Sequence, residues 1–432
     1  MKQTQQVLRL LRAHESRNVL FTEPDGSWPI VWERAKGVHV WDAEGRKYLD
    51  LTAAFGVASA GHANPAVVRA GQRQMGTLLH AMGDVHPHAQ KALLARELSR
   101  LTFGRWSGGK ASGKVIYSNS GFEAVEAALK TAILATGRRG VLAFKGAYHG
   151  LGYGALNATH RDHFRSAFRD QLGDFGQFVP FPTTEDDLPK LEAAIRKLFK
   201  RHPIGAILAE PLQARGGINV PPSGFLPLLR RLCDEHGALL ILDEIYTGFG
   251  RTGRWFACEH SGVTPDLLCL GKALTGGFPL SACIGRADMM DAAWPASTGE
   301  AIHTSTFLGH PVGCAMALAQ ISEIQRLKLV QRSAKLGKNL LDQLRELNTE
   351  NLELNTSARG LGLMVGLELR RRDGSPAGAE AIAVIKAMLH RGYVLLPEGE
   401  HGNVISLTPP LTITERQLAT SVTTLKEELH RL

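Results

Sequence analysis

Two short apolar runs between Ala238 and Pro279 constrain what this chain can fold into, because each is followed by a charged residue. The first run closes with Asp243, and the second closes just before Lys272. Runs of this length are typical of buried parallel strands, and α/β sheets bind ligands at the carboxyl ends of such strands. A lysine amine can form a Schiff base with an aldehyde, and a carboxylate can keep a pyridine nitrogen protonated. The pattern therefore predicts a site for a pyridine cofactor.

A second candidate site lies where residues 117–123 lead into a helix-forming run at 124–132. A strand, a small polar turn and a helix present free backbone N–H groups and the positive end of a helix dipole to an anion. Ser120 and Gly121 occupy the turn, and Ser120 also suits the N-cap of the helix without any further role. Because this turn precedes Asp243 and Lys272 in the chain, it predicts a phosphate site that belongs with them.

Two glycine patterns point to other cofactors and fail. Residues 108–114 fit the phosphate-binding Gly-x-x-x-x-Gly-Lys pattern, but Val115 stands where a Ser or Thr must reach Mg²⁺, and a strand-like run follows. We interpret this segment as a surface turn. Residues 248–253 match Gly-x-Gly-x-x-Gly, but they do not follow their strand directly and no clear helix comes after them. A nicotinamide-dependent oxidoreductase is therefore only a remote alternative.

Strand and helix signals alternate from about residue 113 to about residue 285, which favours an α/β fold with a parallel sheet and right-handed crossovers. Beyond about residue 327 the pattern is typical of a smaller α+β region. It predicts an amphipathic helix, a single strand at 360–368, a helix at 379–390, further strands and a last helix at 415–432. Thr414 and Gln417 resemble a capping box for the last helix.

The motifs Asp-Glu-Ile-Tyr-Thr-Gly-Phe-Gly-Arg-Thr-Gly at 243–253 and Gly-Lys-Ala at 271–273 resemble those of class III (ω-type) pyridoxal-phosphate aminotransferases of fold type I. The resemblance extends from about Val38 to Thr414. It implies a large domain with a mostly parallel seven-stranded sheet between helices, and a smaller α+β domain built from both termini. The implied bounds are 1–68 for the N-terminal segment of the small domain, 69–326 for the large cofactor-binding domain and 327–432 for the C-terminal part of the small domain.

The resemblance also implies roles for individual residues. Lys272 would hold pyridoxal 5'-phosphate as a Schiff base and move protons once a substrate amine displaces it, while Asp243 would keep the ring nitrogen protonated. Tyr148 and Ile245 would cover the two faces of the ring. The other implied cofactor contacts are Ser120, Gly121 and Phe122 at the phosphate, Tyr246 at the 3-hydroxyl, and Thr306 at the phosphate of the other subunit's cofactor. The last contact implies a homodimer with shared active sites.

Three further positions concern the substrate. Family members that use glutamate commonly carry a glutamate at the position of Arg215 and an arginine at the position of Ser406, and that arginine binds the substrate α-carboxylate. In this chain the arginine, Arg215, occupies the position at which those members carry the glutamate. We hypothesise that Arg215 receives a substrate carboxylate through bidentate hydrogen bonds, and the alternative is an ordinary surface arginine. By the same resemblance Phe55 would face the substrate, with a place in the core as the alternative.

Composition and charge argue against several other classes. The chain of 432 residues has a net charge of +9, but its basic runs are short, so we expect no nucleic-acid partner. No apolar stretch reaches membrane-spanning length and no signal sequence is evident, which predicts a cytoplasmic protein without membrane contact. The five cysteines are odd in number and scattered, as expected for reduced thiols rather than disulfides or a metal site.

The resulting hypothesis is ping-pong transfer of an amino group from an ω-amine or amino acid to a 2-oxo acid, pyruvate or 2-oxoglutarate. The same lysine and cofactor would also serve an amino-acid racemase or epimerase, or an aminomutase. A catalytically idle binding protein on this fold is a further alternative. Nothing in the sequence favours it, because the lysine and the aspartate are both present.

Overall fold

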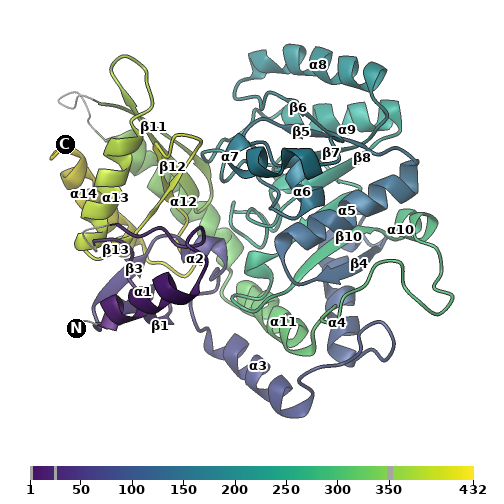
Figure 1. The fold of residues 1–432 in the computed structure, drawn as a ribbon, viewed down its shortest axis with the longest axis horizontal. Helices are drawn as coiled ribbons and strands as arrows, with labels where there is room; N and C mark the ends of the chain where they lie inside the picture. Colours follow the sequence, from purple (N-terminus) through teal and green to yellow (C-terminus); the bar gives the residue numbers. More distant parts are fainter. Residues whose placement is uncertain (1–2, 24–26, 348–353) are drawn as a thin grey trace.

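The computed structural model describes residues 3–23, 27–347 and 354–432. A seven-stranded sheet forms its larger part (Figure 1), in the order β4 (Gly113–Ser118), β10 (Ser281–Arg286), β9 (Leu267–Leu270), β8 (Leu239–Asp243), β7 (Ile204–Ala209), β5 (Gly140–Phe144) and β6 (Gly176–Val179). Strands β9, β8, β7, β5 and β6 run parallel, whereas β10 is antiparallel to both of its neighbours, β4 and β9. The prediction of a mostly parallel sheet is confirmed.

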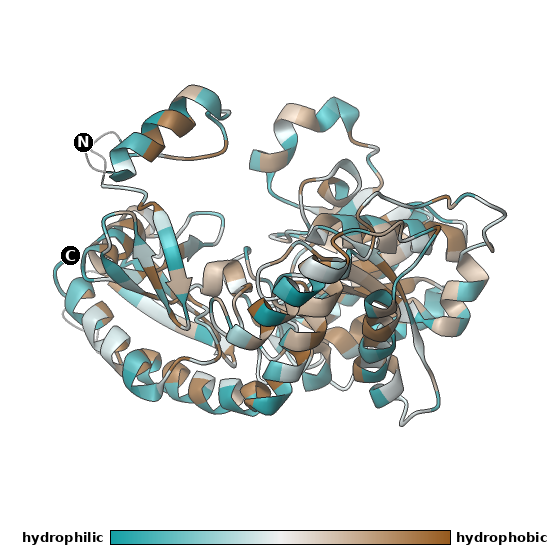
Figure 2. Cartoon of the chain, turned by 90° about the horizontal axis from the view of Figure 1, so that it is seen from below, coloured by the Kyte–Doolittle hydropathy of each residue, from teal (hydrophilic) through white to brown (hydrophobic). Residues whose placement is uncertain are grey.

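Helices cover both faces of this sheet. One face packs on α5 (Gly121–Thr136), α6 (Tyr153–Ala158) and α10 (Ala287–Ala293) through strand residues such as Val141 and Leu208. The alternate strand residues, such as Leu142 and Leu240, pack on α4 (Ala89–Ser99), α8 (Leu188–Arg201), α9 (Phe225–His236) and α11 (Pro311–Arg326). Figure 2 shows that the outer helices carry both hydrophilic and hydrophobic residues, as expected when each helix buries one face. Burial on both faces explains the unbroken apolar runs in the sequence.

Two smaller sheets lie beside the large one (Figure 1). The first has the order β1 (Trp32–Lys36), β2 (His39–Asp42), β3 (Lys47–Asp50) and β13 (Tyr393–Val394). The second has the order β11 (Leu354–Leu361), β12 (Met364–Arg371), β15 (Val404–Leu407) and β14 (Leu396–Glu398). Strands β3 and β13 pair in parallel, so segments from both ends of the chain share one sheet, as predicted. The residue bounds of the domains stay a prediction.

The predicted single strand at 360–368 is wrong. The chain turns at Gly362, and β11 and β12 form an antiparallel hairpin in which Leu361 lies opposite Met364. Gly362 has a φ of +54°, and a Cβ at this position would clash with the backbone carbon of Thr252. Only glycine fits this left-handed, closely packed turn. The apolar residues on both sides of the turn made the two strands look like one.

The predicted helices at 379–390 and 415–432 correspond to α13 (Gly378–His390) and α14 (Glu415–Leu429). The capping box is confirmed, because Thr414 and Gln417 exchange hydrogen bonds of 2.9 Å and 3.2 Å between side chains and backbone N–H groups. The remaining helices are α1 (Gln3–His14), α3 (Pro65–Thr77), α7 (Asp162–Arg165) and α12 (Leu329–Arg345), with short turns α2 (Ala53–Gly56), η1 (Arg100–Gly104), η2 (Ser166–Gln171), η3 (Glu185–Asp187), η4 (Ala257–His260) and η5 (Lys272–Leu274). Within the described ranges, no helix combines the length and the apolar character needed to cross a membrane.

The fold brings the candidate residues to one edge of the large sheet. Asp243 is the last residue of β8, and Lys272 comes just after β9. Glu210 follows β7 directly, and Tyr148 follows β5. Because these strands are parallel neighbours, their carboxyl ends meet at the same edge.

Candidate active site

A cavity of about 370 Å³ lies at the carboxyl ends of β8 and β9. Most of the predicted site residues line it, although they come from strand ends, from the start of α5 and from separate loops. These residues are Gly121, Phe122, Tyr148, Arg215, Asp243, Ile245, Tyr246 and Lys272. His149 and Glu210 line the cavity as well, and the sequence had assigned no role to either of them.

Lys272 directs its amine into this cavity. Its Nζ lies 3.7 Å from the centroid of the Tyr246 ring, and its backbone has a φ of +41°, which is uncommon for a residue with a side chain. Burial lowers the pKa of Lys272 to about 8, and the charge of Asp243 opposes part of that shift. An amine with this pKa is largely neutral, and therefore nucleophilic, in mildly alkaline solution.

Asp243 is held in place by two hydrogen bonds. Its Oδ1 accepts from the backbone N–H of Ile245 at 3.1 Å, and its Oδ2 lies 2.8 Å from Nδ1 of His149. The other ring nitrogen of His149, Nε2, is buried and has no hydrogen-bond partner in the described part of the chain. The ring of His149 thus orients a buried carboxylate toward the cavity, where it can bind a protonated ring nitrogen.

The N-terminus of α5 forms a cradle for an anion. Ser120 is the N-cap, and Oε2 of Glu123 accepts hydrogen bonds from its backbone N–H at 2.7 Å and its hydroxyl at 2.8 Å. The backbone N–H groups of Gly121 and Phe122 have no partner among the described residues, and both residues line the cavity. Free N–H groups at a helix N-terminus suit a phosphate group. Ser120 itself does not line the cavity, because its side chain is engaged with Glu123.

The walls of the cavity suit a flat ring. Tyr148 contributes an aromatic wall and Ile245 an aliphatic one, and such surfaces exclude water and fix a ring plane. Ile245 lies so close to the cradle that a Cβ at Gly121 would come within 3.0 Å of its Cδ1. The hydroxyl of Tyr246 lies 3.2 Å from Oγ1 of Thr408, which fixes the ring beside the lysine amine. The groups that line the cavity therefore fit pyridoxal phosphate, because they comprise an amine, a buried acid, a phosphate cradle and two apolar walls.

Glu210 is a buried acid in the cavity that was not predicted from the sequence. Its two carboxylate oxygens accept hydrogen bonds from the backbone N–H groups of Tyr148 at 3.1 Å and Ala214 at 3.0 Å. Burial raises the pKa of Glu210 to about 7, with the nearby His149 opposing the shift. Its position directly after the apolar strand β7 was the signal that could have found it, as it was for Asp243.

Arg215 lies in the cavity with its guanidinium carbon 5.5 Å from the centroid of the Tyr148 ring. It is therefore not an ordinary surface arginine. Its partner is Glu398, the last residue of β14, whose Oε2 lies 3.6 Å from Nε of Arg215. Glu398 is buried, and this burial raises the pKa of its carboxyl group. No local pattern marks Glu398, because it meets Arg215 only through the packing of the second small sheet against the loop after β7, and it does not itself line the cavity.

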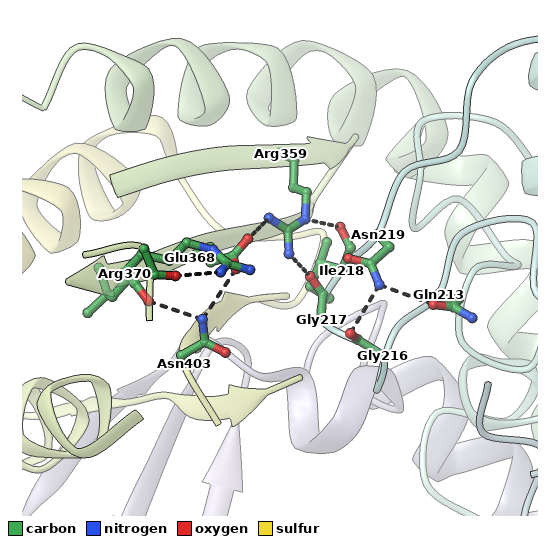
Figure 3. A network of polar contacts seen from close by, with 11 residues as sticks. Gln213, Gly216, Gly217, Ile218, Asn219, Arg359, Glu368, Arg370 and Asn403 are labelled. Atoms are coloured by element: carbon green, nitrogen blue, oxygen red, sulfur yellow. Dashed lines mark hydrogen bonds and ion pairs between the residues drawn. The ribbon is translucent and has the colours of Figure 1, made fainter. Parts of the chain in front are cut away.

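A polar network anchors the loop that carries Arg215 (Figure 3). Arg359 of β11 donates hydrogen bonds to the carbonyl oxygens of Ile218 at 3.1 Å and Gly217 at 2.7 Å. The same guanidinium donates to Oε2 of Glu368 in β12 at 2.5 Å. The network as drawn also includes Gln213, Gly216, Asn219, Arg370 and Asn403. It ties the loop after β7 to the second small sheet, and so fixes the backbone that carries Arg215.

Three other predicted residues lie outside the lining of the cavity. Ser406 is buried in β15, opposite Gly366 of β12. Thr306 is exposed in the segment between α10 and α11. Phe55 is 49% exposed on a left-handed turn with a φ of +60°, so its placement in the core is wrong.

Residues 21–429 match the family model described as aminotransferase class-III. The 5-aminovalerate aminotransferase DavT of Pseudomonas aeruginosa is 38% identical over 410 residues, covering 92% of this chain and 93% of that protein. The putrescine aminotransferase of Pectobacterium atrosepticum is 38% identical over 414 residues, covering 94% and 84%. A solved structure of the ornithine aminotransferase from Toxoplasma gondii, described with partial occupancy of PLP at its active site, has a TM-score of 0.85 at 28% identity and covers 99% of this chain and 95% of that one.

Proposed function

Because this chain belongs to the class III aminotransferases, which transfer amino groups with pyridoxal phosphate, we propose that Lys272 and Asp243 are its catalytic pair. When bound, the cofactor supplies an aldehyde and an electron-withdrawing ring. Lys272, with its lowered pKa, is the nucleophile toward that aldehyde and afterwards carries a proton at Nζ. Asp243, oriented by His149, keeps a proton on the ring nitrogen. The observation that carries this assignment is that the amine and the acid line one cavity with the free N–H groups of α5.

The other cofactor contacts follow from the same cavity. We assign the phosphate to the N–H groups of Gly121 and Phe122, with Ser120 as the cap that shapes the turn. Tyr148 and Ile245 cover the ring faces, and Tyr246 holds its ring against the lysine amine.

We propose a terminal amine as donor and pyruvate or 2-oxoglutarate as acceptor. The two relatives act, by their names, on 5-aminovalerate and putrescine, and both compounds carry a terminal primary amine. Arg215 offers its guanidinium inside the cavity, and every 2-oxo acid carries a carboxylate that such a group binds. Phe55 and Ser406 are not among the residues that line this cavity, and we assign the substrate carboxylate to Arg215.

We also propose a homodimer. Segments 78–85 and 302–307 contact each other, with the rings of His80 and Phe307 5.3 Å apart and the Thr304 hydroxyl 2.6 Å from Oδ2 of Asp84. Apolar side chains are exposed on both segments, namely Leu78, Leu79, Met82, Val85, Ile302 and Phe307. A second copy of the chain is the occupant that suits such a patch, and it would cover Thr306 as well. Sedimentation at micromolar concentration is expected to show a dimer, and a stable monomer would refute this part. The buried, unpaired cysteines favour a cytoplasmic location.

Two half reactions with the purified holoenzyme test the proposed activity. A terminal amine such as 5-aminovalerate is expected to bleach the visible absorbance of the bound cofactor, and pyruvate or 2-oxoglutarate is expected to restore it. A racemase, an epimerase or an aminomutase would turn over without an acceptor. A nicotinamide enzyme or an idle binding protein would show no bleaching. If no terminal amine bleaches the absorbance, the proposal fails.

A further inference from the structure

The amine of Lys272 lies over the face of the Tyr246 ring. The distance of 3.7 Å from Nζ to the ring centroid is the shortest of its kind among the described residues. In the same ranges only one other lysine lies over a ring, namely Lys47, which is 5.7 Å from the ring of Trp41. Nζ of Lys272 makes no hydrogen bond and no ion pair with a described residue. The ring is therefore the closest partner that the protein offers to a charge on this amine.

The backbone of Gly56 packs against the Tyr246 ring. Gly56 has a φ of +80°, and a Cβ at this position would lie 3.0 Å from Cε1 of Tyr246. A residue with a side chain would be strained in this conformation and would press on the ring. Tyr246 is also buried in a cluster with Leu212, Met364 and Val404. Close packing of this kind leaves the ring little room to move away from the amine.

The hydroxyl of Tyr246 is engaged by the protein itself. It lies 3.2 Å from Oγ1 of Thr408, and the Thr408 hydroxyl donates to the carbonyl oxygen of Thr52 at 3.3 Å. A carbonyl oxygen only accepts, so the proton of Thr408 is used there and the Tyr246 hydroxyl is the donor to Thr408. Burial raises the pKa of Tyr246 to about 12, which keeps its hydroxyl protonated. The one proton of this hydroxyl is therefore not available to the 3-hydroxyl of the cofactor.

Four other side chains act on the charge of Lys272. The carboxylates of Asp243, Glu398 and Glu210 favour the ammonium form. The guanidinium of Arg215 disfavours it, and burial outweighs the carboxylates, so the pKa of Lys272 is lowered to about 8. A group that moves protons must nevertheless hold one for part of each turnover. The face of an aromatic ring suits this need, because it attracts a cation and takes no proton from it.

We propose that Tyr246 is a positioning residue that acts through its ring face and holds the ammonium form of Lys272 in the cavity while this amine carries a proton. The hydroxyl of Tyr246 serves to fix the ring through Thr408. Because the attraction ends when the amine loses its proton, the ring stabilises one protonation state of Lys272 and not the other. This inference rests on the proposed role of Lys272 in transamination.

A series of rings of nearly constant shape tests the inference. Tyr246→Phe removes the hydroxyl and keeps the ring, and phenylalanines with one, two or three ring fluorines at this position weaken the attraction of the ring face in steps. On the cofactor-free protein, the rate at which acetic anhydride acetylates Lys272 is measured against pH by mass spectrometry of peptides, because only the neutral amine reacts. The exposed Lys145 is the control within each sample.

The expected result is a stepwise fall in the pKa of Lys272. Tyr246→Phe should leave this pKa close to that of the wild type, and the three fluorines together should lower it by about one pH unit. If the fluorinated rings leave the pKa of Lys272 unchanged or raise it, the inference is overturned. A fall that is already complete in Tyr246→Phe would assign the effect to the hydroxyl and would overturn it as well.

A second measurement uses the wild type, so that the inference stays testable if a fluorinated variant does not fold. The ring carbons of Tyr246, identified by their loss in Tyr246→Phe, are expected to shift in NMR spectra with a midpoint near pH 8, the pKa of Lys272. The absence of this step, or its persistence in Lys272→Ala, would refute the inference.

These measurements need no amine donor, which separates the inference from the function beneath it. If donors bleach the holoenzyme while the pKa of Lys272 ignores the ring, only the inference falls. If no donor bleaches the holoenzyme, the proposed function falls, and the role of Tyr246 in it falls too.

Discussion

The cavity has two sides that differ in how their polar groups are satisfied. On the cofactor side, formed by Gly121, Phe122, Tyr148, Asp243, Ile245 and Lys272, the protein itself orients the acid and the phosphate cradle through hydrogen bonds. On the proposed donor side, Arg215 lines the cavity and faces the buried Glu398, which does not line it, at 3.6 Å and without a hydrogen bond. The protein thus completes the part of the site that serves every turnover. We propose that the part left without hydrogen bonds is the part that binds the substrate.

The two sides also differ in origin. Neighbouring strand ends of a single sheet, together with the start of α5, supply the cofactor side. The donor side forms where a loop after β7 meets the end of β14 in another sheet. Substitutions on the cofactor side should therefore affect all donors alike, whereas those on the donor side should affect donors selectively.

The largest effect is expected from Lys272→Ala. Without this amine there is neither a nucleophile toward the aldehyde nor a group to move the proton, so kcat/KM should fall by at least about 10³-fold for every donor. Steady-state assays measure the loss, and Lys145→Ala, at an exposed lysine after β5, is the control. A loss confined to some donors would contradict the division into two sides.

The pKa of Lys272 predicts how fast the cofactor-free protein takes up pyridoxal phosphate at each pH. A pKa lowered to about 8 means that the protonated, unreactive amine dominates below that pH and the neutral amine above it. Uptake should slow by about tenfold for each pH unit below 8 and level off above it. Stopped-flow absorbance measures the rate. A rise that continues to about pH 10 would mean that Lys272 titrates like an exposed lysine.

Arg359→Met probes the donor side without touching the cavity. The change removes hydrogen bonds to two loop carbonyls and leaves Glu368 without its closest partner, so the free energy of unfolding should fall by about 2 kcal/mol. The selectivity between donors with and without a carboxylate should narrow, while the dissociation constant of the cofactor should not change. Denaturant unfolding and donor assays test both effects. Arg370→Met, at a half-exposed pair with Glu368, should cost less than about 1 kcal/mol.

Gly121→Ala should have the smallest effect and stay on the cofactor side. The added methyl group would meet Cδ1 of Ile245 at 3.0 Å and displace it slightly. We expect a cost of about 1 kcal/mol, or roughly fivefold in the dissociation constant of the cofactor, with donor selectivity preserved. Spectroscopic titration measures it, and Gly76→Ala, where a Cβ meets nothing within 4 Å, is the matched control. An altered donor ratio would show that the two sides are coupled.

The sequence was sufficient to predict most of the residues that line the proposed cofactor side of the cavity, because these residues stand at the ends of local patterns. Asp243 and Lys272 close apolar runs, and Gly121 stands between a strand and a helix. Glu398 could not be found in this way, since its significance comes from a contact with a loop far away in the chain. The same limit applies to Gly362, where two strands with one apolar pattern are separated by a turn that only tertiary packing requires.

Phe55 shows a further limit. It belongs to a turn in which Ala53, Ala54 and Phe55 all have positive φ, a conformation for which alanine has no preference. Hydrogen bonds to the side chain at the end of β3 hold the turn: the buried Asp50 accepts from the backbone N–H groups of Thr52 at 2.8 Å and Ala54 at 3.1 Å. No local propensity predicts such a turn, so the exposure of the Phe55 ring could not be predicted from the sequence.

Strand β3 meets its parallel partner β13 only after nearly the whole chain has left the ribosome. During synthesis, the edge of β3 in the first small sheet therefore stays unpaired until β13 has been made, which is after the strands of the large sheet. Glu398 emerges just after β13, long after Asp243 and Lys272. A nascent chain stalled before β13 would therefore already contain Asp243 and Lys272, but it would lack Glu398 and the strand that completes the first small sheet.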